Sequence, residues 1–153
     1  MHQLSATVQD VTASTFDGIE ALAVVLVAIT ARAIHEEASG HGLTMLQWRA
    51  FMELAVRPLR LTQLAARLPA SVPATSKLVA RLIDHGLMSS EPDRADARAL
   101  QIRLTPEGLE LRERILRRRR AYIVAAVGPD ALPPALDAGL HEIALRLQAA
   151  TSR

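Results

Sequence analysis

Apolar residues recur three and four positions apart between residues 14 and 38, which predicts one long helix. Its buried stripe is expected to consist of Ile19, Leu22, Val25, Leu26, Ile29 and Ala33. Because Val24 and Val27 make the opposite side apolar as well, this helix should have neighbours on two sides, within the subunit or from a second one. We expect the polar residues before about Val11 to be frayed.

A second helix is predicted over Met45–Val56, after a glycine-containing turn that breaks the first one. Thr44, with Gln47 three positions later, has the capping-box pattern of a helix start. Pro58 ends this helix, and Leu61 begins a short third one.

The next stretch has the two-sided pattern of a helix that packs on the core with one face only. Ser71 is a good N-cap residue, and Gly86 suits the position after the last turn. On a 3.6-residue period, one side carries Thr75, Leu78, Val79 and Leu82. The other side is small, polar and cationic, with Pro73, Ser76, Lys77 and Ala80, and with Arg81 at its margin. One side can therefore pack on a core while the other stays free.

A period of two residues replaces the helical period after this helix. Residues 100–104 alternate apolar with polar, as a half-buried strand does, and residues 88–91 can form its antiparallel partner. The polar loop between them carries Arg94 and Arg98 near its tip. The pattern therefore predicts a basic two-stranded hairpin.

Two further helices complete the chain. Thr105 at the N-cap and Pro106 at the first helical position begin a long helix that ends at Gly128. Pro133-Pro134 begins the last helix, whose apolar stripe is Leu136, Leu140, Ile143 and Leu147. The predicted fold is mainly α with a small β hairpin.

A helix-turn-helix followed by a basic two-stranded wing is the shape of a DNA-reading unit. The residues that we expect to act in DNA binding are Ser71, Pro73, Ser76, Lys77, Arg81, Arg94, Asp96 and Arg98. The helix residues Ser76, Lys77 and Arg81 can reach base edges or phosphates in the major groove. The wing arginines suit the negative potential of the minor groove. Asp96 would orient Arg98 through a charge-assisted pair.

The same stretch resembles the multiple-antibiotic-resistance regulators, the MarR family of bacterial winged-helix transcription factors. Asp96-x-Arg98, then five residues, Leu104-Thr105 and Gly108, is similar to the family's D-x-R-x5-L-T-x-x-G signature. Further matching positions are Leu43-Thr44 to Trp48, Leu64-Ala65, Ser71-x-Pro73, Leu78-Val79-x-Arg81-Leu82 and Gly86-Leu87. Nearly the whole chain is covered, although the specific motifs lie between about residues 43 and 108.

The resemblance implies a single winged-helix domain over residues 1–153, with a DNA-reading unit at about 44–104. The helices at about 14–38 and 106–150 would form a dimerisation layer. It also implies a homodimeric repressor that binds a near-palindromic double-stranded operator, needs no cofactor, and is released by a small apolar or aromatic effector. In the family, the effector pocket lies between the reading unit and the dimerisation helices, where His35, Trp48 and Met52 could meet.

The composition of the chain is compatible with a DNA-binding protein and excludes some other features. The chain has 153 residues, which suits a single domain, and its net charge is only +2. Because it contains no cysteine, it can hold neither a disulfide nor a thiol switch. Between residues 57 and 103, seven arginines and one lysine face four acidic residues, a local excess of four positive charges. The apolar run at residues 21–31 is 11 residues long, short of the ~20 that a membrane span needs. We expect a cytoplasmic protein without membrane contact.

Three other functions have to be weighed. The residues contain no G-x-S-x-G, Gly-rich phosphate loop or H-E-x-x-H pattern, so an enzyme is not expected. Sparse polar residues on the exposed helix face would suit a protein-interaction module without DNA binding, whereas the basic wing favours DNA. His35, His41 and the adjacent carboxylates suggest a metal-responsive regulator, but no histidine pair has i, i+4 spacing. We therefore expect no metal site.

Overall fold

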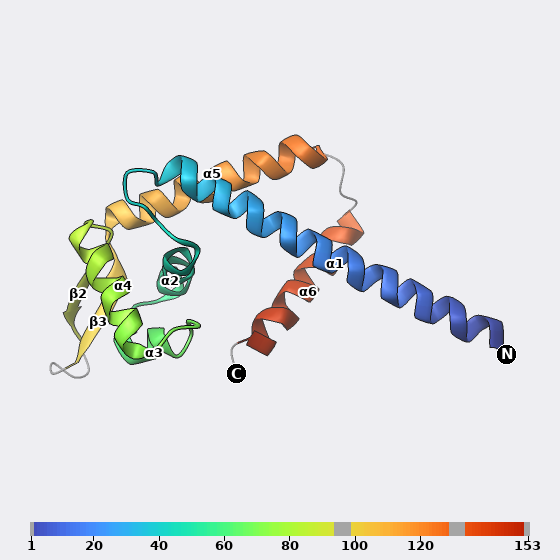
Figure 1. Ribbon diagram of the computed structural model, residues 1–153, viewed down its shortest axis with the longest axis horizontal. Helices are drawn as coiled ribbons and strands as arrows, with labels where there is room; N and C mark the ends of the chain where they lie inside the picture. The colour runs from blue at the N-terminus through green and yellow to red at the C-terminus, as the bar shows by residue number, and fades with distance from the viewer. Residues whose placement is uncertain (1, 94–98, 129–133, 152–153) are drawn as a thin grey trace.

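The computed structural model describes residues 2–93, 99–128 and 134–151. In chain order its elements are α1 (His2–Glu37), α2 (Met45–Val56), β1 (Leu59–Arg60), α3 (Leu61–Ala65), α4 (Val72–Asp84), β2 (Met88–Pro92), β3 (Leu100–Leu104), α5 (Pro106–Val127) and α6 (Pro134–Thr151). Figure 1 shows α2, α3, α4 and the sheet gathered at one end of the molecule, with α1 and α5 crossing above them. The fold is mainly α with a small antiparallel sheet, as predicted.

The sheet has the order β1-β3-β2, and both pairings are antiparallel. Met88 lies opposite Leu104 in the β2–β3 hairpin, which confirms the predicted wing strands. The sequence did not predict β1, where Leu59 lies opposite Ile102. Two residues are too few to show a period of two, so β1 is defined by its pairing with β3 alone.

The core is formed by buried side chains of α2, α4, α5 and the sheet, with contributions from the end of α1 and from α3. Its fully buried large side chains include Phe51, Leu59, Leu64, Leu82, Leu87, Leu111 and Ile115. The capping box predicted for α2 is confirmed, because Thr44 N donates to Gln47 Oε1 at 2.7 Å and Gln47 N to Thr44 Oγ1 at 3.3 Å. Trp48 stacks with Phe51 at a ring separation of 6.5 Å. This packing gives α4 and the wing a common base.

The start of α5 is fastened to the turn that follows α4. Thr105 Oγ1 donates to Gly86 O at 2.7 Å, and Gly108 N donates to Thr105 Oγ1 at 3.0 Å. A Cβ atom at Gly108 would lie 2.1 Å from Leu87 O, closer than any side chain can approach. The Thr-x-x-Gly sequence therefore allows two backbone segments to meet.

The first helix differs from its prediction in where it begins and in how far its middle is buried. It begins at His2, so the expectation of frayed residues before Val11 is wrong. No glycine or proline interrupts residues 2–17, and the helix continues through this polar stretch. In the predicted stripe, Ala33 is buried, but Leu22 and Val25 are 53% and 52% exposed in the single chain. The middle of α1 is thus an apolar surface instead of a core helix.

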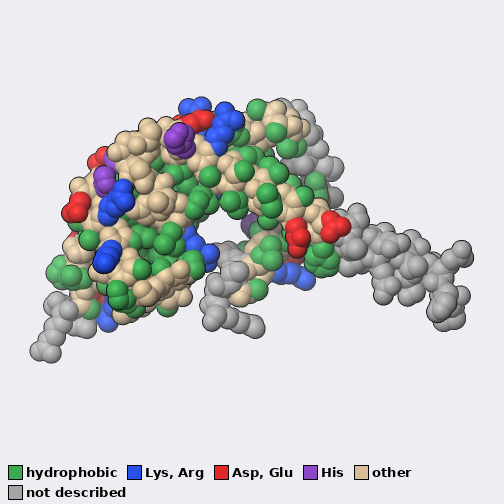
Figure 2. All heavy atoms as spheres, in the orientation of Figure 1, with side chains coloured by type: hydrophobic (Ala, Val, Ile, Leu, Met, Phe, Trp, Pro, Cys, Tyr) green, Lys and Arg blue, Asp and Glu red, His purple; other side chains and the backbone are tan. Residues whose placement is uncertain are grey.

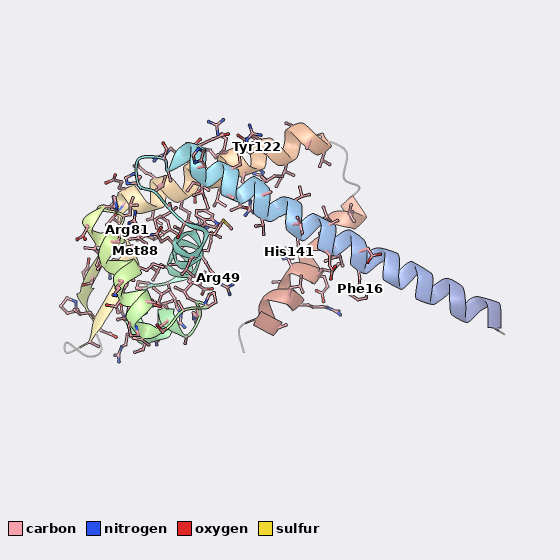
Figure 3. The ribbon with its side chains drawn as sticks, in the orientation of Figure 1. Phe16, Arg49, Arg81, Met88, Tyr122 and His141 are labelled. Carbon is pink, nitrogen blue, oxygen red and sulfur yellow. The ribbon has the colours of Figure 1, made fainter. Side chains whose placement is uncertain are left out.

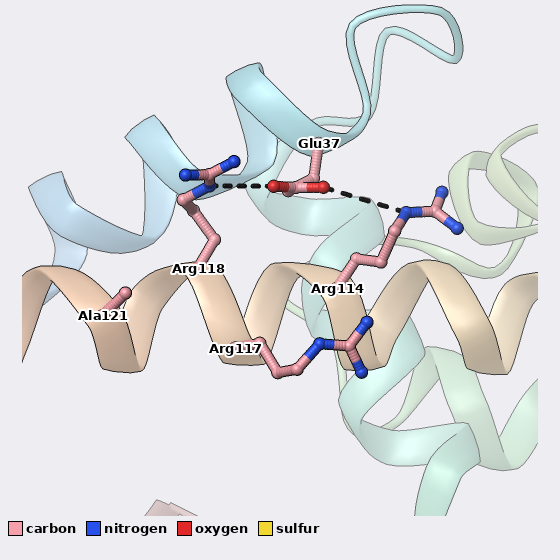
Figure 4. A pocket seen from close by; sticks show the side chains of 5 residues that line it. All are labelled: Glu37, Arg114, Arg117, Arg118 and Ala121. Carbon is pink, nitrogen blue, oxygen red and sulfur yellow. Dashed lines mark hydrogen bonds and ion pairs between the residues drawn. The ribbon is translucent and has the colours of Figure 1, made fainter.

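Within the described residues, the stretch Phe16–Glu37 of α1 is long and apolar enough to cross a membrane by length and composition. Its last turns, however, pack on α5 through polar contacts. Glu37 accepts from Arg118 Nε at 2.8 Å and forms an ion pair with Arg114 at 3.8 Å, as Figure 4 shows. Tyr122 donates to Glu36, and this hydrogen bond and that from Arg32 lower the pKa of the Glu36 carboxyl. These contacts make α1 part of the folded domain.

Candidate nucleic-acid interface

The backbone of α4 is held at both ends as the sequence predicts. Ser71 Oγ accepts from Ala74 N at 3.4 Å, and Thr75 Oγ1 donates to Ser71 O at 3.0 Å. At the other end, Gly86 has a φ of 71°, a conformation that favours glycine. The helix is therefore fixed independently of any ligand.

The two sides of α4 are divided as its period predicts. Thr75, Val79 and Leu82 are buried against the core. The exposed side carries Pro73, Ser76, Lys77 and Ala80, with Arg81 exposed at its margin. These side chains have no role in the core and are available to a partner.

Arg81 points away from the centre of this exposed side. A Cβ atom at Gly42 would meet Arg81 Nη2 at 3.3 Å, so the guanidinium lies beside the turn that follows α1. Figure 3 places Arg81 near the end of α4, toward that turn. Ser76 and Lys77 are more central to the candidate interface than Arg81.

The wing is defined at its base. Asp93 N donates to Ala99 O at 2.8 Å, which closes the loop between β2 and β3. Lower in the hairpin, Arg103 of β3 pairs with Glu91 of β2 at 3.1 Å. The tip residues Arg94, Asp96 and Arg98 lie outside the described residues, so their roles stay predictions.

An ion pair that the sequence did not predict fastens this base to the helix-turn-helix. Arg60 Nε lies 2.8 Å from Asp93 Oδ2, and Asp93 is only 7% exposed. Arg60 is also the residue before α3, so the pair joins the start of α3 to the start of the wing loop. A buried carboxylate next to an arginine is a strong, directional contact. The partners are 33 positions apart, and no local pattern could have paired them.

The residues predicted for an effector pocket are only partly brought together. Trp48 and Met52 line a cleft of 660 Å³. Its other lining residues are Met45, Leu46, Arg49, Glu53, Pro69 and Leu147. His35 is exposed on α1 and does not line this cleft. The cleft therefore lies between α2 of the reading unit and α6, with a largely apolar lining.

The histidines and carboxylates that suggested a metal-responsive regulator make other contacts in the structure. The carboxylates of Glu36 and Glu37 pair with arginines of α1 and α5. His41 lies edge-on to His85 at a ring separation of 5.8 Å. Among the described residues, no three histidine or acidic side chains are grouped as metal ligands would be.

Comparison with known proteins shows similarity to one family of transcriptional regulators. A model of the MarR family matches residues 41–99, which contain the helix-turn-helix and the first strand of the wing and end just before β3. No curated protein matches the chain significantly. Among solved structures, RV1404 from Mycobacterium tuberculosis is similar at 27% identity and a TM-score of 0.71, over 88% of this chain and 90% of that one.

Two further structures extend the comparison. Sco3205 from Streptomyces coelicolor, a MarR family transcriptional regulator solved in complex with DNA, is 28% identical, with a TM-score of 0.63 over 88% of this chain and 83% of that one. YusO from Bacillus subtilis shares the fold at 19% identity and a TM-score of 0.63, over 93% of this chain and 97% of that one.

Proposed function

From the premise that this chain is a MarR family transcriptional regulator, we propose that it is a homodimeric, sequence-specific DNA-binding repressor released by a small molecule. The observation that carries the proposal is the free side of α4 next to a wing fixed at its base by Arg60 and Asp93. Such a unit holds a recognition helix and the base of a wing in a fixed relation to each other, which suits binding to DNA. The site of action is then the cytoplasm.

In this proposal α4 enters the major groove. Ser76 and Lys77 reach base edges or phosphates there, and Ser71 and Pro73 lie at the leading end of the helix. The wing tip enters the adjacent minor groove with Arg94 and Arg98, and Asp96 holds Arg98 in place. Phosphate contacts supply most of the affinity, so binding should weaken steeply as salt is raised.

Substitutions in the wing tip and in α4 test DNA binding. We expect Arg98→Ala to lower affinity by roughly tenfold, most for sites with A·T-rich, narrow-grooved flanks. Lys77→Ala should weaken all sites similarly if Lys77 contacts phosphate, or relax one base position if it contacts a base. Gel shifts on DNA selected from a random pool measure both effects, and Arg120→Ala, an exposed arginine of α5, is the control.

The same assay separates the roles within the wing. If Asp96 only orients Arg98, Asp96→Ala should resemble Arg98→Ala, and the double variant should be little worse than Arg98→Ala alone. Removing Asp96 also removes a negative charge near phosphates, so the cycle is repeated at several salt concentrations. Full additivity at each of them would show that Asp96 does not orient Arg98. A protein that retains no DNA at low salt would instead be an interaction module.

The homodimer is proposed because apolar side chains of the terminal helices stay exposed in the single chain. Leu22 and Val25 of α1 and Leu140 and Leu147 of α6 are each at least 39% exposed. Figure 2 shows hydrophobic side chains along α1 and around the opening between α1 and α6. A two-fold dimer would place two α4 helices about one DNA turn apart, roughly 34 Å, on a near-palindromic site.

Release by an effector is supported by the cleft beside Trp48 and Met52. Its lining is largely apolar and contains Arg49 as well as Glu53, and we propose that Arg49 pairs with the carboxylate of a small apolar or aromatic acid. We expect such a compound to raise the melting temperature of the protein and to lower its affinity for DNA. The Met52→Trp variant fills the cleft with a larger side chain and should abolish both responses. A nearly complete switch requires about 10⁴-fold preference for the low-affinity state. The proposal of release fails if a broad panel of these acids moves neither quantity.

A further inference from the structure

The first turn of α4 presents apolar side chains where the proposed function places the base pairs. Val72, a residue outside the set predicted for DNA binding, is 44% exposed. Pro73 and Ala74 next to it are exposed as well. In helix-turn-helix proteins, the N-terminal residues of the second helix contact the base edges. These apolar side chains are therefore the first to meet the floor of the groove.

The polar side chains of this turn make hydrogen bonds within the protein, which leaves chiefly the Ser71 O–H group for an outside partner. Ser71 Oγ accepts a hydrogen bond from Ala74 N, and Thr75 is fully buried and bonded to Ser71 O. The nearest exposed polar side chains further along α4 are Ser76 and Lys77. The leading turn thus has few groups with which to read hydrogen-bond donors and acceptors, and an apolar feature of the bases suits it better.

The thymine C5-methyl is the apolar group that base pairs present in the major groove. Resting on the proposed DNA-binding function, we propose that Val72 reads a thymine methyl group in each half-site, with Pro73 packed beside it. Contact removes both apolar surfaces from water, whereas a base pair without the methyl leaves Val72 against polar edges or solvent. Val72 is then a specificity determinant, and Lys77 supplies charge-based affinity one turn later.

The methyl group can be removed from DNA without any other change. Duplexes selected by the full-length protein are resynthesised with each thymine of the half-site replaced in turn by deoxyuridine, and dissociation constants are measured. We expect one or two positions at which the replacement weakens binding about fourfold per half-site, the effect of exposing one methyl group. Thymines outside the reach of the leading turn should tolerate uracil.

The Val72→Ala variant tests whether Val72 is the residue that detects the thymine methyl group. At the sensitive position the variant should bind the thymine duplex about fourfold more weakly than the unaltered protein, and should bind thymine and uracil alike. Val56→Ala, at the 75% exposed end of α2, is the matched control and should keep the full preference for thymine. Because Val72 is on the surface and alanine is the better helix former, the melting temperature should not fall.

Each outcome bears on the inference. Equal binding of every uracil-substituted duplex by the unaltered protein would overturn it, as would a Val72→Ala variant that still prefers thymine. Both results leave the proposed DNA binding intact, because each requires a measured DNA complex. Failure to select any DNA sequence overturns the proposed function and this inference together.

Discussion

Replacing Gly108 with alanine should unfold much of the protein at temperatures where the unaltered chain is stable. The new Cβ would lie 2.1 Å from Leu87 O and 3.1 Å from Leu87 C, and both are backbone atoms. A flexible side chain could move away, but Leu87 O is also held by a hydrogen bond from Thr105 N at 3.2 Å. Either α5 or the turn after α4 has to shift, and the core between them loosens.

The expected cost is large on the scale of domain stability. Overpacking typically costs about 1–3 kcal/mol and more where only backbone can move, so we expect roughly 3–5 kcal/mol here, against about 5–15 kcal/mol for the whole free energy of unfolding. For a chain of this size the melting temperature should fall by about 10–15 °C. Thermal unfolding followed by circular dichroism measures the change.

Gly40→Ala is the matched control for this substitution. A Cβ atom at Gly40 meets nothing within 4 Å, and the backbone φ there is not positive. Alanine in such a position restricts the unfolded chain and stabilises the protein by about 0.4–1 kcal/mol. The two glycine substitutions should therefore change stability in opposite directions. A Gly108→Ala variant as stable as the unaltered chain would contradict the close approach of α5 to Leu87.

The Gly108 contact illustrates which structural features could be predicted from the sequence. The Leu-Thr-x-x-Gly part of the family signature is a packing device: Leu104 is buried, Thr105 caps α5 and Gly108 admits Leu87 O. Thr105 as N-cap and Pro106 as first helical residue predicted the start of α5 to the residue, although the reason for the glycine is visible only in three dimensions. Local features such as caps and periodic faces were predictable because their causes lie within a few residues.

Contacts between distant positions were not predictable in this way. How the helices pack decides three features that the sequence did not reveal. These are the Arg60–Asp93 pair, the two-residue strand β1 and the position of His35 away from the cleft beside Trp48. The apolar middle of α1 was expected to be buried within the subunit or by a second one, and a single chain leaves it exposed. Sequence periodicity identifies an apolar face but does not say which molecule covers it.

Leu140→Asp tests whether a second copy of the chain covers these faces. Leu140 is 39% exposed in the single chain, on the α6 stripe that also contains Leu136 and Ile143. In a two-fold interface each substitution acts twice. Each lost leucine contact costs about 1.5–3 kcal/mol, and each carboxylate placed against an apolar surface adds a desolvation penalty.

The sum is on the order of 5 kcal/mol or more for each dimer, so the dimer dissociation constant should rise by about 10⁴-fold. Light scattering at micromolar concentration should show a dimer for the unaltered protein and a monomer for the variant. DNA affinity should fall by about 10²-fold or more, because a monomer loses the effective concentration that joins two half-sites. The melting temperature of the reading unit should change much less, since Leu140 is not part of its core.

Val56→Asp distinguishes this effect from a general response to a new charge. Val56 is 75% exposed at the end of α2, in the reading unit instead of the terminal helices. The same exchange of an exposed apolar side chain for a carboxylate should leave the dimer intact there. If the unaltered chain were a monomer at micromolar concentration, or if Leu140→Asp remained dimeric, the apolar faces of α1 and α6 would need a different partner. In the first case the two half-sites of the operator would have to be bound by independent monomers, and in either case DNA affinity would not depend on Leu140.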